Sequence, residues 1–260
     1  MKTVLWVALA ALVAAPAALA SPSGGAYRRP HIPLQWEQHR AVALLARRGE
    51  PVFCGGTRDN AVALTFDDGP GPYTAQLIDE LRAGGAHATF FVVGNRIPYW
   101  AEDVHTEREV GAVGNHTWSH PHLTWLPSWL VWLELMRTQW DVRAALGWKP
   151  RLFRAPYERH NPRVDSIVRR VGLLEVFWSV DSRDWTPGAN VRRVVRNVVA
   201  GLRPGAIVLM HDIHPWTVAA VPQILQAIRL RGLRAVSVPE LLALDPPRPW
   251  THCSTPTPAP

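Results

Sequence analysis

Two neighbouring carboxylates stand at the end of an apolar run in this chain. Residues Ala61 to Phe66 are followed directly by Asp67, Asp68, Gly69 and Pro70. Glycine and proline favour a turn at this point, and aspartate beside Gly-Pro is also common in ordinary turns. Adjacent carboxylates at a strand end can instead divide two tasks, with one binding a cation and the other acting as a base.

Two histidines, His116 and His120, are spaced four residues apart. On a helical turn this spacing places both imidazoles on one face, where they can bind a single metal ion. With Asp68 they form a His-His-carboxylate set that leaves one position open, as in catalytic rather than structural zinc sites. His122 is a competing ligand, ranked lower because it lies out of this register and beyond Pro121.

Two further apolar runs end in groups that hydrolysis requires. Residues Arg151 to Arg154 lead into Ala155-Pro156-Tyr157, and Ala206 to Met210 lead into His211. Each could be a mere surface feature. A guanidinium and an imidazole at strand ends would nevertheless supply a group that orients the base and an acid that protonates the leaving group.

These groups depend on the elements that position them, and the apolar runs alternate with amphipathic segments. The predicted strands cover 61–66, 88–93, 151–154, 173–180, 206–210 and 234–237, and the main predicted helices cover 34–48, 75–83, 128–146, 163–171, 191–202 and 217–231. This alternation indicates βαβ units and a parallel sheet, closed or open. Catalytic groups in such folds collect at the carboxyl ends of the strands, where every motif above is expected.

Five ordered motifs carry a resemblance to a known family. They are Thr65-Phe66-Asp67-Asp68-Gly69-Pro70, His116-Thr117-Trp118-Ser119-His120, Arg154-Ala155-Pro156-Tyr157, Asp181-Ser182-Arg183-Asp184-Trp185 and Leu209-Met210-His211. Over residues 58 to 243 the chain resembles the NodB-homology polysaccharide deacetylases, carbohydrate esterase family four. The resemblance implies an α/β fold, a distorted (β/α) barrel with fewer than eight full strands.

The same resemblance implies a role for each motif residue. Asp67 matches the general base, Arg154 the residue that braces it, His211 the general acid and Asp184 the carboxylate that tunes the acid. The backbone N–H of Tyr157 would help to bind the developing oxyanion. The implied ligands of a divalent metal, Zn²⁺ first with Co²⁺ or another divalent ion as alternatives, are Asp68, His116 and His120, and the implied substrate contacts are Pro156, Tyr157, Trp185 and Leu209.

One loop departs from the family pattern. The family usually has a second proline before Pro156 and a glycine after the aromatic residue, where this chain has Ala155 and Glu158. Glutamate adopts a positive φ less readily than glycine, so we expect a differently shaped loop and an altered substrate fit rather than altered metal binding.

The ends of the chain predict export. Residues 1–20 read as a signal peptide cleaved after Ala20, with an uncleaved membrane anchor as the rival interpretation. A leader with a short helix over 21–57, a catalytic domain over 58–245 and a proline-rich tail over 246–260 complete the prediction. In an exported chain the two cysteines, Cys54 and Cys253, can form a disulfide, the alternative being two free thiols.

The net charge and the aromatic residues indicate the function less specifically than the motifs do. The formal charge of +7 suits association with an anionic cell envelope or simple solubility, and no nucleic-acid motif accompanies it. A cluster of tryptophans at 125–140 predicts a helix packed on the barrel, from Ser128 as N-cap to Gly147; exposed rings that stack on sugars or rest on a membrane are the alternative. Trp118 and Trp185 are better candidates for the substrate groove.

The sequence therefore predicts a secreted, monomeric enzyme that removes N-acetyl groups from N-acetylglucosamine-containing polysaccharide, either peptidoglycan or chitin-like oligomers. Two alternatives stay open. The same groups would cleave the O-acetyl esters of xylan, and a carbohydrate-binding pseudoenzyme would keep the groove without turnover. Intact Asp67, Arg154 and His211 argue against the pseudoenzyme, because a binding protein does not need an acid and a base.

Overall fold

A curled parallel sheet forms the centre of the computed structural model, which describes residues 33–248 and Cys253. The predicted signal peptide and most of the predicted tail lie outside these residues. The sheet order is β5-β4-β3-β2-β1-β7-β6, with β8 paired to the start of β1, and every ladder is parallel. The strands are β1 Ala61–Asp67, β2 Ala88–Val92, β3 Gly111–Asn115, β4 Leu152–Phe153, β5 Leu174–Glu175, β6 Val180–Asp181, β7 Ile207–His211 and β8 Arg234–Val236.

This sheet confirms the predicted distorted barrel. β4, β5 and β6 have only two residues each, and among the described strands no ladder joins β5 to β6. The segment after the first helix partly covers this gap, because Val52 bridges Val176 and Cys54 bridges Ala206. A disulfide joins Cys54 to Cys253, with 5.8 Å between their Cα atoms.

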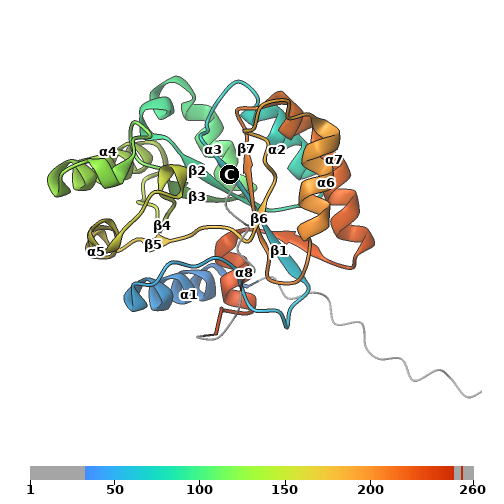
Figure 1. Cartoon of the computed structure of the whole chain (residues 1–260), viewed down its shortest axis with the longest axis horizontal. Helices are drawn as coiled ribbons and strands as arrows, with labels where there is room; N and C mark the ends of the chain where they lie inside the picture. The colour runs from blue at the N-terminus through green and yellow to red at the C-terminus, as the bar shows by residue number, and fades with distance from the viewer. Residues whose placement is uncertain (1–32, 249–252, 254–260) are drawn as a thin grey trace, which may run out of the picture. The chain divides into compact units, whose positions relative to one another are not determined.

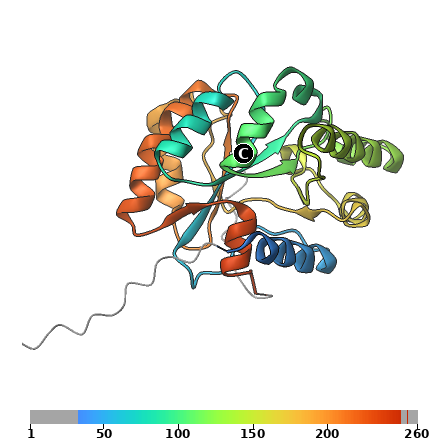
Figure 2. The same cartoon turned by 180° about the vertical axis from the view of Figure 1, so that it is seen from behind.

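Helices cover the outside of the sheet (Figure 1). α2, α6 and α7 lie on one side and α4 and α5 on the other, while both views place α1 beside α8 (Figure 2). None of the helices in the described part of the chain is long and apolar enough to span a bilayer. Their bounds are α1 Gln35–Arg48, α2 Thr74–Ala83, α3 Ala101–Glu109, α4 Ser128–Leu146, α5 Pro162–Val171, α6 Val191–Gly201, α7 Pro215–Leu230 and α8 Val238–Leu244.

Alternation along the strands decides which side chains face the inside of the curl. Leu64 and Phe66 of β1 pack into a hydrophobic cluster with residues of α2 and α7, whereas Ala63 packs into a second cluster with residues of α1 and α8. Because side chains alternate with period two, Asp67 shares the face of Ala63. The register then sets Asp67 beside His211 at the carboxyl end of the sheet.

The predicted single strand over 173–180 is wrong, since the structure has β5 and β6 with an irregular segment between them. In that segment the Phe177 N–H donates to Val52 O and the Ser179 N–H to Ile207 O, so its partners lie on two different elements. β3 was not predicted, because its two glycines give a weak strand signal. Both glycines fit tightly: a Cβ on Gly111 would lie 1.9 Å from Ala88 O, and one on Gly114 would lie 2.6 Å from the Phe91 ring.

The helix predicted over 128–146 has the expected bounds, but its tryptophan side chains are exposed instead of buried. α4 covers Ser128–Leu146 and ends at Gly147 with a φ of 80°, but its N-cap is Pro127, not Ser128. The helix buries Val131, Leu135 and Val142, whereas Trp129 is 64% exposed and Trp132 and Trp140 are also exposed. The interpretation of these rings as core residues is therefore wrong.

Candidate active site

A cavity of about 610 Å³ opens at the carboxyl ends of the strands. Most of the predicted site residues contribute to its lining, although they are spread over the chain from β1 to β7. Arg154 and Asp184 are fully buried, and Pro156 is buried outside the lining. The predicted residues that line the cavity are Asp67, Asp68, His116, His120, Tyr157, Trp185, Leu209 and His211.

Asp68, His116 and His120 converge as a three-residue cluster in this cavity. Asp68 Oδ1 lies 3.1 Å from His120 Nε2 and 3.5 Å from His116 Nε2. The Nδ1–H of His116 donates to the Arg154 carbonyl oxygen over 2.8 Å, which leaves the Nε2 lone pair facing Asp68. Asp68 Oδ1 itself is buried and accepts no hydrogen bond from the described groups. Lone pairs that face one another in this way fit a bound divalent cation.

An irregular loop, not the predicted helical turn, brings the two histidines together. Thr117 has a φ of 67° and His120 a φ of 60°, both in the left-handed region. Glu134 of α4 anchors this loop, because its carboxylate accepts the backbone N–H groups of Trp118 and Ser119 at 2.9 and 2.8 Å. The sequence does not predict this role of Glu134, since nothing local to α4 indicates which loop its side chain contacts.

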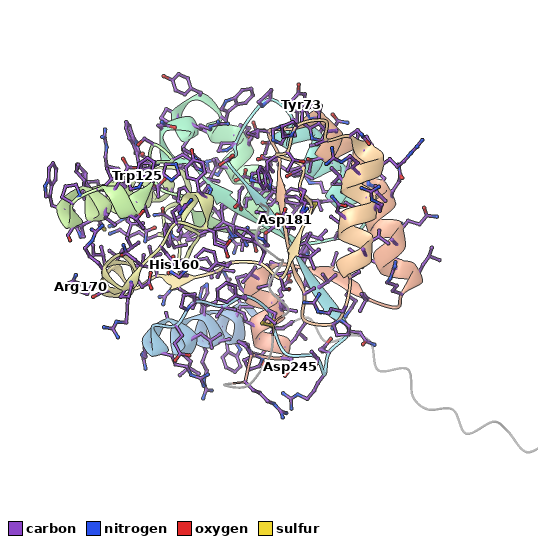
Figure 3. All side chains as sticks on the ribbon, in the orientation of Figure 1. Tyr73, Trp125, His160, Arg170, Asp181 and Asp245 are labelled. Carbon is purple, nitrogen blue, oxygen red and sulfur yellow. A yellow bond between two sulfur atoms is a disulfide. The ribbon has the colours of Figure 1, made fainter. Side chains whose placement is uncertain are left out.

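His122 does not join the cluster. Its ring stacks on Tyr157 with centroids 4.1 Å apart and an interplanar angle of 18°, and it packs against Trp125 at the same distance. Trp125 is 78% exposed and lies at the start of the α4 region (Figure 3). Trp118 does not line the cavity either: its ring lines a separate hollow, with the Arg137 guanidinium 3.5 Å from the ring centroid.

A buried guanidinium braces Asp67. Arg154 Nη1 donates to Asp67 Oδ1 and to Thr65 Oγ1, both over 2.7 Å. Arg154 Nε and Nη2 donate to the carbonyl oxygens of Val176 and Phe177, in the irregular segment between β5 and β6. Burial lowers the pKa of Arg154, and the Asp67 charge opposes that shift. The second carboxylate oxygen of Asp67 lies 3.8 Å from His116 Nε2.

A second buried carboxylate holds His211. Asp184 Oδ1 lies 2.8 Å from His211 Nδ1, and Asp184 Oδ2 accepts the His211 backbone N–H and the Thr217 hydroxyl, each over 2.7 Å. Burial alone would lower the pKa of His211. The charge and hydrogen bond of Asp184, with smaller contributions from Asp68 and Asp67, outweigh it and raise the pKa to about 10. The sequence does not predict the contact between Thr217 and Asp184, which joins two distant parts of the chain.

The loop that departs from the family pattern turns sharply. Tyr157 and Glu158 have φ values of 58° and 54°, so Glu158 adopts the left-handed conformation that glycine would adopt more readily. The Tyr157 hydroxyl lies 3.1 Å from His120 Nδ1. Position 158 therefore has a positive φ although its residue is glutamate rather than glycine.

Comparison with known proteins agrees with this arrangement. The family model described as polysaccharide deacetylase matches residues 55–176. A chitooligosaccharide deacetylase from Bradyrhizobium sp. (strain ANU 289) is 37% identical over 218 residues, covering 77% of this chain and 98% of the relative. This chain belongs to the polysaccharide deacetylase family. The motif resemblance and the predicted fold are thereby confirmed.

This chain is also similar to a second curated relative and to a solved structure. The peptidoglycan-N-acetylglucosamine deacetylase PgdA of Listeria monocytogenes serotype 1/2a is 38% identical over 182 residues, which cover 69% of this chain and 38% of that relative. This chain therefore matches well under half of the length of PgdA. The structure of a family 4 carbohydrate esterase from Streptomyces lividans, solved in complex with acetate, matches this one with a TM-score of 0.65 at 37% sequence identity. The match covers 69% of this chain and 93% of the esterase chain.

Proposed function

We propose that this chain is a secreted, metal-dependent hydrolase that removes N-acetyl groups from N-acetylglucosamine-containing polysaccharide and releases acetate. Peptidoglycan and chitin-like oligomers are the favoured substrates. One observation carries the proposal: a single cavity contains a carboxylate braced by buried Arg154 and an imidazole held by buried Asp184, beside the three-ligand cluster. The activities named for the relatives support the same reaction.

Asp68, His116 and His120 would hold the metal, and two imidazoles with one carboxylate suit Zn²⁺. A divalent cation bound there would act as a Lewis acid on the acetyl carbonyl and would acidify the attacking water. The remaining steps belong to side chains and backbone groups of the chain itself.

Asp67 would be the general base. Its Oδ1 is engaged by Arg154, so Oδ2 is the oxygen that would take a proton from the attacking water. The hydroxyl then adds to the carbonyl carbon of the acetamide. The Tyr157 backbone N–H would stabilise the negative charge on the carbonyl oxygen, and Leu209 and Trp185 would form the wall against which the acetyl group lies.

His211 would be the general acid. Asp184 engages its Nδ1, so the Nε2–H is the group that would donate a proton to the departing nitrogen. The carbon–nitrogen bond breaks, and acetate and a free amino sugar are released. The raised pKa keeps the imidazole protonated at neutral pH, as this role requires.

The disulfide between Cys54 and Cys253 supports the proposed secretion, because disulfides persist in oxidising compartments. Export and signal-peptide cleavage would be tested by N-terminal sequencing of the protein recovered from the medium of an expressing host. A mature chain that begins at Ser21 is the expected result, and retention of the first twenty residues would contradict it.

Acetate release tests the reaction itself. The purified protein, supplied with zinc, would be incubated with peptidoglycan, chitooligosaccharides and acetylated xylan. Release from either N-acetylated substrate supports the proposal and names the substrate class, whereas release from xylan alone would make the chain an O-acetyl esterase. No release from any of the three, with zinc shown to be bound, would leave the carbohydrate-binding role.

A further inference from the structure

A second cluster of metal-binding side chains lies outside the catalytic cavity. It consists of His160, which follows the Tyr157 loop, Asp165 in the first turn of α5, and Glu175 at the end of β5. Donor atoms of the three residues lie within 4.8 Å of one another, and His160 Nδ1 is 3.1 Å from Asp165 Oδ1. None of the three lines the catalytic cavity, and Figure 3 labels His160 on the α5 side of the sheet.

Glu175 is the unusual member of this cluster. Its side chain is only 5% exposed, and neither carboxylate oxygen accepts a hydrogen bond from any N–H or O–H donor of the described residues. Instead it faces the carboxylate of Asp165. Two carboxylates in contact must share a proton or bind a cation, because both cannot stay charged and unpaired at low cost. Without a cation, burial first and then the Asp165 charge raise the pKa of Glu175 to about 8.

We propose that His160, Asp165 and Glu175 bind a second divalent cation, Zn²⁺, with a structural role. One imidazole and two carboxylates are a donor set that zinc accepts, and manganese is the nearest rival. Tetrahedral zinc with bonds of about 2.0 Å sets its donor atoms about 3.3 Å apart, so no donor pair of this cluster needs to close by more than about 1.5 Å. Glu50 lines a small crevice together with Asp165, Glu175 and Arg169, and its carboxylate is the candidate fourth ligand.

The position of the cluster explains what such a cation would do. It would join three separate elements: the segment after the Tyr157 loop, the start of α5 and the end of the two-residue strand β5. This is the part of the sheet where the ladder to β6 is missing among the described strands. A cation there would hold the loop that carries Tyr157 and Glu158 in its left-handed conformation.

Zinc stoichiometry tests the proposal independently of the enzymatic reaction. The protein would be stripped with a chelator, dialysed against zinc and then against buffer, and analysed by inductively coupled plasma mass spectrometry. We expect about two zinc ions per chain in the wild type, about one in His116→Ala and in Glu175→Gln, and none in the double variant. Glu175→Gln that still binds two ions, or His116→Ala that binds none, would overturn the second site.

Thermal unfolding provides a second measurement and guards against misfolded variants. In the His116→Ala background, zinc should raise the Tm, and Glu175→Gln should abolish that rise while leaving the Tm without zinc unchanged or higher, because it removes a buried unpaired carboxylate. His160→Ala should also lose the rise, whereas His105→Ala, which replaces an exposed histidine of α3, should keep it. A rise of equal size in all four proteins would show that zinc acts elsewhere.

Discussion

The two halves of the sheet differ in how they are built. β1, β2, β3 and β7 have five to seven residues each and pair through continuous ladders, whereas β4, β5 and β6 have two residues each. The regular half presents Asp67 and His211 directly at its strand ends. The irregular half presents Tyr157 and Trp185 from loops.

The proposed acid and base therefore belong to the regular half, whereas the proposed contacts of Tyr157 and Trp185 belong to the irregular half. Long strands position the proposed acid and base, while short ladders, isolated backbone bonds and the Arg154 side chain hold the other wall of the cavity. Arg154 connects the halves, because one guanidinium donates to Asp67 and Thr65 of β1 and to the carbonyls of Val176 and Phe177. We expect reaction rate to depend mainly on the regular half and substrate fit on the irregular half.

The largest expected effect is on the regular half. Asp67→Asn should lower kcat by about 10³-fold because it removes the proposed base, while zinc content stays near that of the wild type. Acetate release and metal analysis of the same preparation would check this. Loss of zinc together with turnover would show that Asp67 and Asp68 do not divide the two tasks.

Replacing the bridge between the halves should have the next largest effect. Arg154→Leu leaves the Asp67 carboxylate buried without its partner and should lower the free energy of unfolding by about 3–5 kcal/mol, as measured by urea denaturation. The matched control is Arg170→Leu on the exposed surface of α5 (Figure 3), which should change it by less than about 0.5 kcal/mol. Equal effects would show that Arg154 does not join the halves.

The pH dependence of the reaction tests how the acid is held. Asp184 raises the pKa of His211, so Asp184→Asn should lower that pKa and move the alkaline limb of the kcat profile to lower pH. At pH 8 the loss of kcat should be about 100-fold. Thr217→Val, which removes one hydrogen bond to Asp184 and leaves its charge in place, should shift the limb much less. An unchanged limb in Asp184→Asn would exclude His211 as the titrating acid.

The smallest expected effect lies in the irregular half. Glu158→Gly relieves a left-handed conformation at φ 54° and should raise the free energy of unfolding by about 1 kcal/mol. The neighbouring Arg159 has a φ of −89°, so Arg159→Gly should lower it instead. Urea denaturation of both variants would measure the difference, and a loss of stability in Glu158→Gly would mean that contacts of the glutamate outweigh the strain.

The amino-acid sequence by itself determined the features that depend on local pattern. The sequence predicts β1, β2 and β7 from their apolar runs and α4 from the periodic spacing of its apolar residues. Such patterns need no distant partner. The motif residues lining the cavity were also named from the sequence. Their convergence follows from the parallel topology, which brings all strand ends to one edge.

Only the tertiary structure decided the features that depend on distant partners. The bend between His116 and His120 requires Glu134 of α4, and the break between β5 and β6 is held by Arg154 and by the backbone of Val52. The exposure of the α4 tryptophans likewise depends on which helix face meets the sheet. Such contacts join residues far apart in the chain, so their geometry has no local signal in the order of the amino acids.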